Sequence, residues 1–301
     1  MKHLTKMLDL TKPDIVKILD LADSMKAEHK LGKASKPLEG KTLAMIFQKA
    51  STRTRVSFET GMYQLGGQAL FLSASDLQMG RGEPMEDTAR VLGRYVDGIM
   101  IRTFAQQDVE DLAKWSGIPV INGLTDYDHP CQILADLMTI REHKGQLEGL
   151  KLTYIGDGNN ICNSLIIGCL TMGMRISVAT PKGHEPHQDA LDFARKFSDT
   201  FELVQDPAQA AINADVLVTD VWASMGQEAE AVARMKTFKD YQINDALLSK
   251  ANPGAIVLHC LPAHRGEEIT AEIFEKHANV IFDEAENRLH AQKAVMALLM
   301  K

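Results

Sequence analysis

The chain has 301 residues, of which 45% are hydrophobic and 24% are charged. This composition is typical of a globular protein with room for two domains. Its formal net charge of −7 argues against a nucleic-acid-binding surface, so an anionic ligand would need a local basic cluster. No apolar run approaches the ~20 residues that cross a bilayer, and the N-terminus lacks the pattern of a signal peptide. We therefore expect a cytoplasmic protein.

The periodicity of apolar residues predicts helices and strands that alternate along the chain. In the first half, helices are expected at 10–28, 56–65, 86–94, 108–116 and 130–144, and strands at 41–47, 69–72, 98–102 and 118–121. In the second half, strands are expected at 151–155, 175–179, 215–219, 255–258 and 279–282, with helices between them and a last helix at 284–300. This alternation predicts an α/β fold of two open parallel-sheet domains with helices on both faces, with a boundary at 144–149.

A basic and hydroxyl-rich segment, Ser51-Thr52-Arg53-Thr54-Arg55, stands between a predicted strand and a predicted helix. The first turn of a helix carries free N–H groups and the positive end of the dipole, so it attracts anions. Hydroxyl and guanidinium groups at that point would form a cradle for phosphate or another oxyanion. The alternative is a simple helix cap with solvated arginines.

Other polar side chains also lie at the ends of predicted strands or helices in the first half. Arg102 ends an apolar strand, where a charge needs a carboxylate or an anion as partner. His129 precedes a helix that Pro130 can begin, and Gln132 can both donate and accept hydrogen bonds. A structural ion pair and a capping or core histidine are the alternatives.

In the second half, Gly156-Asp157-Gly158-Asn159-Asn160 resembles a nucleotide-binding turn only in part. The third glycine position holds Ile161, and the strand at 176–181 has no acidic residue for a ribose, so a nicotinamide cofactor is not expected. Asn160 could bind a substrate carboxylate or amine. Asp220, at the end of another strand, is placed to receive a cationic amine or to form a turn.

The segment from His259 to Gly266 follows another predicted strand. Cys260 could be a nucleophile, a metal ligand, a substrate contact or a packing residue. His259 and His264 lie near it, but a fourth ligand is lacking, so we expect no metal. Arg288, at the start of the last helix, is a further candidate for an anion contact, and a solvated helix face is the alternative.

Taken together, these segments closely resemble the motifs of the ornithine carbamoyltransferases. In chain order they read STRTR, HPCQ, DGNN, DVWASMG, HCLPAHRGEEIT and ENRLHAQKA. The resemblance implies a domain at 1–145 for carbamoyl phosphate and a domain at 146–283 for L-ornithine, with the C-terminal helix (284–301) packing back on the first. It also implies a homotrimer, or a multiple of trimers, with sites shared between neighbouring chains.

The implied reaction transfers a carbamoyl group from carbamoyl phosphate to the δ-amine of L-ornithine, giving citrulline and phosphate without a cofactor. The residues that the resemblance assigns to phosphate are Ser51, Thr52, Arg53, Thr54 and Arg102, with Gln78 from the adjacent chain. Those around the carbamoyl group are Thr54, Arg102, His129, Gln132 and Arg288. Those for ornithine are Asn160, Asp220, Ser224 and Met225, with Cys260 and Leu261 near the δ-amine. The expected catalytic residues are Arg102, His129, Gln132, Asp220, Cys260 and Arg288.

Three other functions compete with this interpretation. A carbamoyltransferase for another amine, such as putrescine or an acylated ornithine, is disfavoured by the Ser-Met-Gly loop. A nicotinamide-dependent dehydrogenase is disfavoured by the incomplete turn at 156–160. A non-catalytic binding protein is disfavoured by the full set of polar groups at the strand ends. The sequence does not indicate whether the reaction serves arginine synthesis or arginine breakdown.

Overall fold

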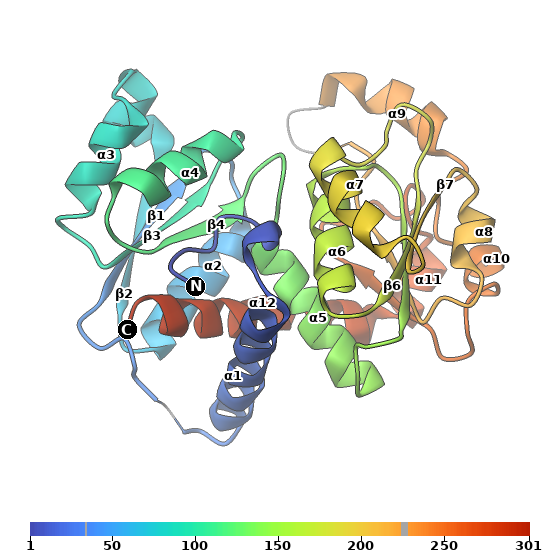
Figure 1. The fold of residues 1–301 in the computed structure, drawn as a ribbon, viewed down its shortest axis with the longest axis horizontal. Helices are drawn as coiled ribbons and strands as arrows, with labels where there is room; N and C mark the ends of the chain where they lie inside the picture. Colours follow the sequence, from blue (N-terminus) through green and yellow to red (C-terminus); the bar gives the residue numbers. More distant parts are fainter. Residues whose placement is uncertain (34, 224–227) are drawn as a thin grey trace. The chain divides into compact units, whose positions relative to one another are not determined.

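The computed structural model describes residues 1–33, 35–223 and 228–301. It divides into two compact units: unit 1 comprises Met1–Met138 and Asn287–Lys301, and unit 2 comprises Thr139–Glu286. The division falls within two helices, α5 (Pro130–Lys144) and α12 (Ala278–Leu299). Each unit has its own sheet, and α5 and α12 contribute residues to both units. We describe the two units separately (Figure 1).

Unit 1 is organised around a sheet of four parallel strands in the order β2-β1-β3-β4. The strands are β1 (Thr42–Phe47), β2 (Gln68–Ser73), β3 (Gly98–Arg102) and β4 (Val120–Leu124). The helices are α1 (Lys12–Lys30), α2 (Thr52–Gln64), α3 (Met85–Leu92) and α4 (Gln106–Trp115), joined by the first part of α5 and the last part of α12. Because β1 lies beside β3, the order of the strands reverses between these two.

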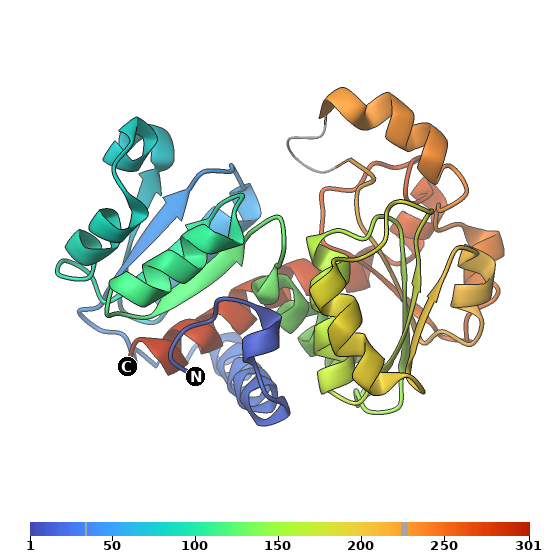
Figure 2. The same cartoon turned by 45° about the horizontal axis from the view of Figure 1, so that its top comes forward.

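Both faces of this sheet are covered. Ala44 and Ile46 alternate along β1 and pack with Ile99 of β3 against buried residues of α3 and α4. On the opposite face, a Cβ atom added to Gly98 would come within 3.0 Å of Met300, just after α12. Figures 1 and 2 show α3 and α4 on one side of the sheet and α2 and α12 on the other.

Unit 2 contains a sheet of five parallel strands in the order β7-β6-β5-β8-β9. The strands are β5 (Lys151–Ile155), β6 (Arg175–Ala179), β7 (Phe201–Val204), β8 (Val216–Thr219) and β9 (Ile256–His259). The helices are α6 (Asn160–Thr171), α7 (Gln188–Ala194), α8 (Pro207–Ala211), α9 (Ala231–Phe238), α10 (Asp245–Leu248) and α11 (Ala271–Lys276). Helices α6 and α7 lie on one side of the sheet, and α8, α10 and α11 lie on the other (Figures 1 and 2).

The predicted α/β class with parallel sheets is confirmed, but the predicted strand at 279–282 is wrong. These residues belong to α12. Ile281 is buried while Phe282 is 56% exposed, and the next buried positions are Glu284, Asn287 and Arg288. Burial at i, i+3 and i+7 is the period of a helix, and a short apolar run does not distinguish the two structures.

Strand β7 was not predicted. It is an edge strand of four residues (Phe201–Val204), and none of its side chains is fully buried. A short edge strand that is only half buried lacks the continuous apolar run that marks a central parallel strand. The sequence therefore gives little signal for it.

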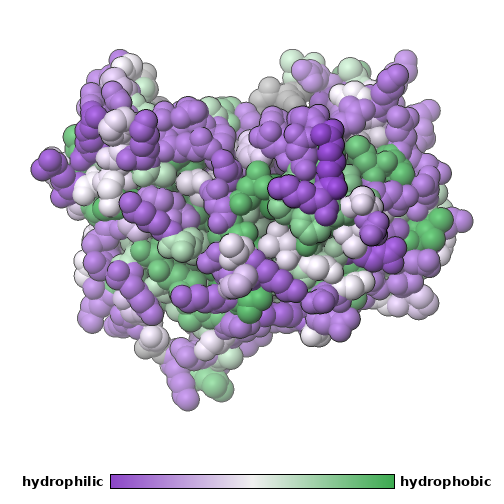
Figure 3. Space-filling view, in the orientation of Figure 1, coloured by the Kyte–Doolittle hydropathy of each residue, from purple (hydrophilic) through white to green (hydrophobic). Residues whose placement is uncertain are grey.

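The exposed surface is largely hydrophilic on the face drawn in Figure 3, with hydrophobic side chains scattered over it. Among the helices of the described ranges, none is both long enough and apolar enough to span a bilayer.

The N-terminal helix begins with a capping threonine and a proline, two residues that are common at helix starts. Thr11 caps α1, and Pro13 lies in the first turn. The Thr11 hydroxyl accepts a hydrogen bond from the Asp14 N–H at 3.3 Å, and the Asp14 carboxylate accepts from the Thr11 backbone N–H at 3.1 Å. This capping box satisfies N–H groups that the helix itself leaves free. It fixes where the chain turns into the first helix.

We predict that Thr11→Ala lowers the free energy of unfolding by about 1 kcal/mol at neutral pH, whereas Thr11→Ser does not. Hydrogen bonds from Thr11 lower the pKa of Asp14 below its ordinary value of 3.8. A carboxyl group with a lowered pKa stabilises the fold above the unfolded value, and this contribution is lost as pH falls through the folded pKa. The difference between wild type and Thr11→Ala should therefore shrink below about pH 4. Denaturant unfolding at pH 7 and at pH 3 measures it, and a pH-independent difference would contradict the role of Asp14.

Candidate active site

The first group of predicted site residues gathers where β1 and β3 end side by side in unit 1. Phe47 pairs with Arg102 at the carboxyl ends of these strands. In open α/β sheets, ligands bind where the strand order reverses, outside the carboxyl ends. Ser51 caps α2 there, and its hydroxyl accepts from the Thr54 N–H at 3.2 Å. The helix cap is therefore confirmed for Ser51. The cradle for phosphate stays a prediction, and the two are compatible because a helix cap also presents the free N–H groups of the first turn.

Arg288 is bonded directly to two of the other predicted residues. Its Nη1 donates to Gln132 Oε1 at 2.7 Å, and its Nη2 donates to Thr54 Oγ1 at 3.3 Å. Its side chain, like those of Thr54 and Gln132, is buried. The guanidinium is therefore fixed by the protein before any ligand arrives, and the alternative of a solvated helix face is excluded for this residue.

The electrostatics of this group favour an anion. Burial, together with the guanidinium groups of Arg288, Arg102 and Arg53, lowers the pKa of His129 well below 6.5. His129 is consequently a neutral imidazole at pH 7, since the surrounding cations make a further positive charge unfavourable. A neutral imidazole can still donate one hydrogen bond, for example to a carbonyl oxygen.

The remaining residues predicted for carbamoyl phosphate are more exposed. Thr52 is exposed, and Ser51 and Arg53 are half buried at the start of α2. Gln78 is exposed in a 3-10 helix, η3 (Gln78–Arg81). Gln78 is predicted to reach the phosphate that a neighbouring chain binds, and this stays a prediction.

The second group lies in unit 2, where β5 and β8 are neighbours and the strand order reverses again. Asp220 follows β8 and is 6% exposed. Its Oδ2 accepts from Asn159 Nδ2 at 2.8 Å, and its Oδ1 accepts from Cys260 Sγ at 3.0 Å. The carboxylate is thus oriented by groups from the ends of two other strands, as a receptor for a cationic amine requires.

The other residues predicted to bind ornithine lie at the start of α6, after β9, or outside the described residues. Asn160 is half buried in the first turn of α6. Leu261 follows Cys260 with a φ of 60°, a conformation that is unusual for a residue other than glycine. Ser224 and Met225 lie outside the described residues.

A buried carboxylate supports the unusual turn at Leu261. The Leu261 N–H donates to His259 Nδ1 at 2.9 Å, so Nδ1 is an acceptor and the ring proton lies on Nε2. That proton points to Glu268 Oε1 at 2.9 Å, and both side chains are fully buried. Glu268 therefore sets the tautomer of His259, and the imidazole in turn holds the backbone beside Cys260.

Among the residues that the structure describes, two clusters have the residue types that could hold a metal, namely Asp220, His259 and Cys260, and His264, Glu267 and Glu268. In the first cluster, both ring nitrogens of His259 already make hydrogen bonds within the protein. In the second, Glu268 Oε1 accepts from both His259 and the His264 N–H. A metal would have to displace these bonds, so we assign a metal to neither cluster.

The turn at 156–160 packs closely against other parts of the protein. A Cβ atom added to Gly158 would lie 2.3 Å from the backbone of Glu185. Asp157 forms an ion pair with Arg234, which is 6% exposed. Gly158 is therefore needed for close packing against a neighbouring loop, which explains the glycine without a dinucleotide.

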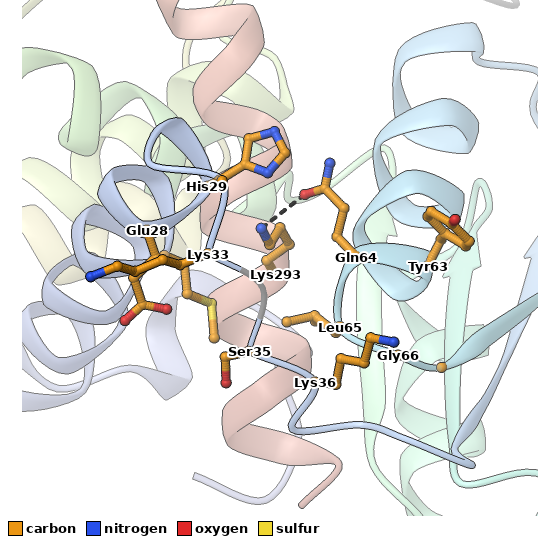
Figure 4. A pocket seen from close by; sticks show the side chains of 13 residues that line it. Glu28, His29, Lys33, Ser35, Lys36, Tyr63, Gln64, Leu65, Gly66 and Lys293 are labelled. Atoms are coloured by element: carbon orange, nitrogen blue, oxygen red, sulfur yellow. Dashed lines mark hydrogen bonds between the residues drawn. The ribbon is translucent and has the colours of Figure 1, made fainter.

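A cavity of about 570 Å³ lies elsewhere in unit 1, between the ends of α1 and α2 and helix α12 (Figure 4). None of the predicted site residues within 1–33, 35–223 and 228–301 lines it. Its buried cation, Lys293, donates to Gln64 Oε1 at 2.8 Å. Burial lowers the pKa of this ammonium group, and the Glu28 carboxylate opposes the shift. The charge is thus accommodated within the protein, and the cavity does not mark the candidate active site.

Two family models match the chain. The carbamoyl phosphate-binding domain of aspartate/ornithine carbamoyltransferases matches residues 2–142, and the aspartate/ornithine-binding domain matches residues 148–299. The chain belongs to the aspartate/ornithine carbamoyltransferase family. Among its relatives in that family is the ornithine carbamoyltransferase of Carboxydothermus hydrogenoformans, 58% identical over 98% of this chain and 96% of the relative.

Solved structures of the same family are similar throughout. The ornithine carbamoyltransferase of Pyrococcus furiosus has a TM-score of 0.95 and 54% identity, covering 99% of this chain and 97% of that one. The anabolic ornithine carbamoyltransferase of Campylobacter jejuni has a TM-score of 0.93 and 44% identity, covering 99% of both chains.

Within this carbamoyltransferase fold, sequence reasoning missed several residues that orient the site. Asn159 was passed over in favour of Asn160, although Asn at a helix N-cap is a recognisable signal. Its side chain both caps α6 and holds Asp220. Glu268 was missed because a lone acidic residue in a charged segment normally predicts a solvated surface.

We predict that iodoacetamide at pH 8 modifies Cys260 in the native protein and leaves the other three cysteines unmodified. Alkylation requires an accessible thiolate. Cys260 is half buried, whereas Cys131, Cys162 and Cys169 are buried. Burial also raises the pKa of Cys131 to about 12. Peptide mass spectrometry measures the sites, and Cys260→Ser is the control. Labelling of Cys131 at a comparable rate would contradict the prediction.

Proposed function

We propose that this protein transfers the carbamoyl group of carbamoyl phosphate to the δ-amine of L-ornithine, giving L-citrulline and phosphate. The observation that carries the proposal is the buried group in unit 1, where Arg288 is bonded to Gln132 and Thr54 beside a neutral His129. Carbamoyl phosphate is an anion with an electrophilic carbonyl group, and this group of residues offers cations and hydrogen-bond donors for both parts. Membership of the carbamoyltransferase family supports the same reaction.

Carbamoyl phosphate is assigned to unit 1. Ser51, Thr52, Arg53 and the first-turn N–H groups of α2 bind its phosphate, because a helix N-terminus favours anions. Attack on the carbonyl carbon builds negative charge on its oxygen. Thr54, Arg102 and His129 are assigned to stabilise that charge, in the manner of an oxyanion hole. Gln132 and Arg288 hold the carbamoyl group for the attack.

Ornithine is assigned to unit 2. Asp220, held by Asn159 and Cys260, receives the δ-amine, and Asn160 with Ser224 and Met225 binds the rest of the amino acid. Cys260 and Leu261 line the space near the amine. The support for this half is the orientation of the Asp220 carboxylate by two hydrogen bonds.

The chemical step is a displacement at the carbonyl carbon. A free alkyl amine has a pKa near ~10, so the δ-ammonium must lose a proton before it attacks. The bond from nitrogen to the carbonyl carbon forms, and the bond from that carbon to the phosphate oxygen breaks. The departing phosphate gains negative charge as it leaves, which makes it a suitable acceptor for a proton. The basic groups that bind the substrate phosphate also stabilise its departure.

We further propose that the working form is a cytoplasmic homotrimer, or a multiple of trimers, in which Gln78 reaches the phosphate of a neighbouring chain. The exposed position of Gln78 in η3 is compatible with that role.

The experiment that tests the function is a colorimetric assay for carbamoylated product with carbamoyl phosphate and four acceptors. L-Ornithine should give product, whereas putrescine, aspartate and N-acetylornithine should not. Product from another acceptor alone would keep the carbamoyl phosphate half and overturn the ornithine half. Absence of product from every acceptor would favour a binding protein.

We predict that Arg102→Ala lowers kcat/KM for carbamoyl phosphate by about a hundredfold, because it removes a donor to the developing negative charge. Arg195→Ala, which removes an exposed arginine paired with Asp192 in unit 2, is the matched control and should leave the value unchanged. Steady-state kinetics measure both variants. If Arg102→Ala kept kcat/KM within about tenfold, the assignment of Arg102 would be wrong.

A further inference from the structure

Gln292 lies one turn beyond Arg288 on α12 and is fully buried. Its Oε1 accepts two hydrogen bonds from the same guanidinium, from Arg288 Nε at 3.1 Å and from Nη2 at 3.0 Å. Its Nε2 donates to Ser57 Oγ on α2 at 2.6 Å. Neither function of this amide is free to rotate, because exchanging its oxygen and nitrogen would break all three bonds.

This arrangement determines where the guanidinium of Arg288 points. A guanidinium is planar and carries five N–H groups in a rigid fork. One edge is held by Gln292, so two of the other N–H groups are directed to Gln132 and Thr54. Without the acceptor on the first edge, the side chain could rotate about its long aliphatic stem.

The chemistry of the acceptors is informative. Gln292 Oε1, Gln132 Oε1 and Thr54 Oγ1 are neutral oxygens. The Asp136 carboxylate accepts from Gln132 Nε2 at 2.8 Å, so the amide of Gln132 stands between it and Arg288. A carboxylate in direct contact would offset the positive charge. These three neutral acceptors fix the geometry of the guanidinium and do not themselves offset its charge.

The same amide connects α12 to the helix that begins at the phosphate-binding segment. Ser57 Oγ, which accepts from Gln292, donates to the Thr54 carbonyl oxygen at 3.2 Å in the first turns of α2. Arg288, Gln292, Ser57 and Thr54 thus form a closed ring of hydrogen bonds. Movement of any member would disturb the group assigned to carbamoyl phosphate.

We propose that Gln292 is a positioning residue for carbamoyl transfer, which acts by orienting Arg288 through a neutral acceptor that does not offset its charge. The proposal rests on the proposed function, because it assigns Arg288 to carbamoyl phosphate. Gln292 itself contacts Arg288 and Ser57 and has no assigned contact with substrate.

The test is a double-mutant cycle between Gln292 and Arg288, with kcat/KM for carbamoyl phosphate as the measured quantity. Gln292→Met, which keeps the length of the side chain and removes the acceptor, should lower kcat/KM at least tenfold. In an Arg288→Ala background, the same substitution should change kcat/KM by less than twofold, because a residue that acts through Arg288 has nothing left to orient. A further tenfold loss in that background would overturn the proposal.

Two further variants separate geometry from charge and guard against a folding defect. Gln292→Glu keeps an acceptor but offsets the charge, so it should also lose activity while its melting temperature stays near that of the wild type. Gln292→Asn withdraws the acceptor by one methylene group and should also lose activity. It replaces Gln292→Met in the test if that variant fails to fold. Full activity of either variant would contradict the proposed role.

The matched control is Gln64→Met. Gln64 also bridges α2 and α12 by a single amide, but it bonds Lys293 and not Arg288. Its substitution should leave kcat/KM unchanged, and an equal loss would show that any polar bridge between these helices is required. The wild-type assay distinguishes a failure of the proposed function from a failure of the proposed role of Gln292. No citrulline from the wild type refutes the proposed function, whereas an active wild type with an active Gln292→Met refutes only the role of Gln292.

Discussion

The chemistry of this protein depends on one constraint of parallel sheets, which is that all strands end at the same edge. In each unit the strand order reverses once, between β1 and β3 and between β5 and β8. At those two points the chain departs from neighbouring strands toward opposite faces, and polar side chains can meet outside the strand ends. The STRTR segment and Arg102 follow one pair of strands, and Asn159 and Asp220 follow the other. The separation of these residues along the sequence is therefore no obstacle to their proximity within each unit.

The predicted site residues of unit 1 and those of unit 2 carry buried charges of opposite sign. In unit 1, buried cations lie around a histidine that stays neutral, whereas in unit 2 a nearly buried carboxylate, Asp220, is oriented by a neutral amide and a thiol. Burying a charge is costly unless hydrogen bonds satisfy it. In both groups, neutral polar side chains fix the orientation of the charged side chain and do not themselves offset its charge. An anion and a cationic amine are the ligands that such a pair of groups suits.

Much of the fold and of the candidate site could be predicted from the sequence, because long periodic segments and polar residues at strand ends carry strong signals. The parallel α/β fold follows from the alternation of elements, and Ser51 and Thr11 were recognisable as helix caps. The failures have local causes. The apolar run from Val280 to Phe282 is compatible with a strand and with a helix. The burial of Glu284 and Arg288 on the same face as Ile281 identifies the helix, and this burial is visible only in the structure. Gln292, Glu268 and Asn159 orient other side chains, and a role that depends on a tertiary partner has no signature in a single sequence.

The composition of unit 1 from two separate pieces of the chain has a consequence for biosynthesis. Asn287–Lys301 belong to unit 1, whereas the whole of unit 2 lies before them in the sequence. Domains commonly fold as units while the chain is being made. On the ribosome, every residue of unit 2 is therefore synthesised before unit 1 receives Arg288 and Gln292. The buried hydrogen-bonded cluster of Arg288, Gln132 and Thr54 therefore cannot form in a nascent chain until the whole of unit 2 has been synthesised.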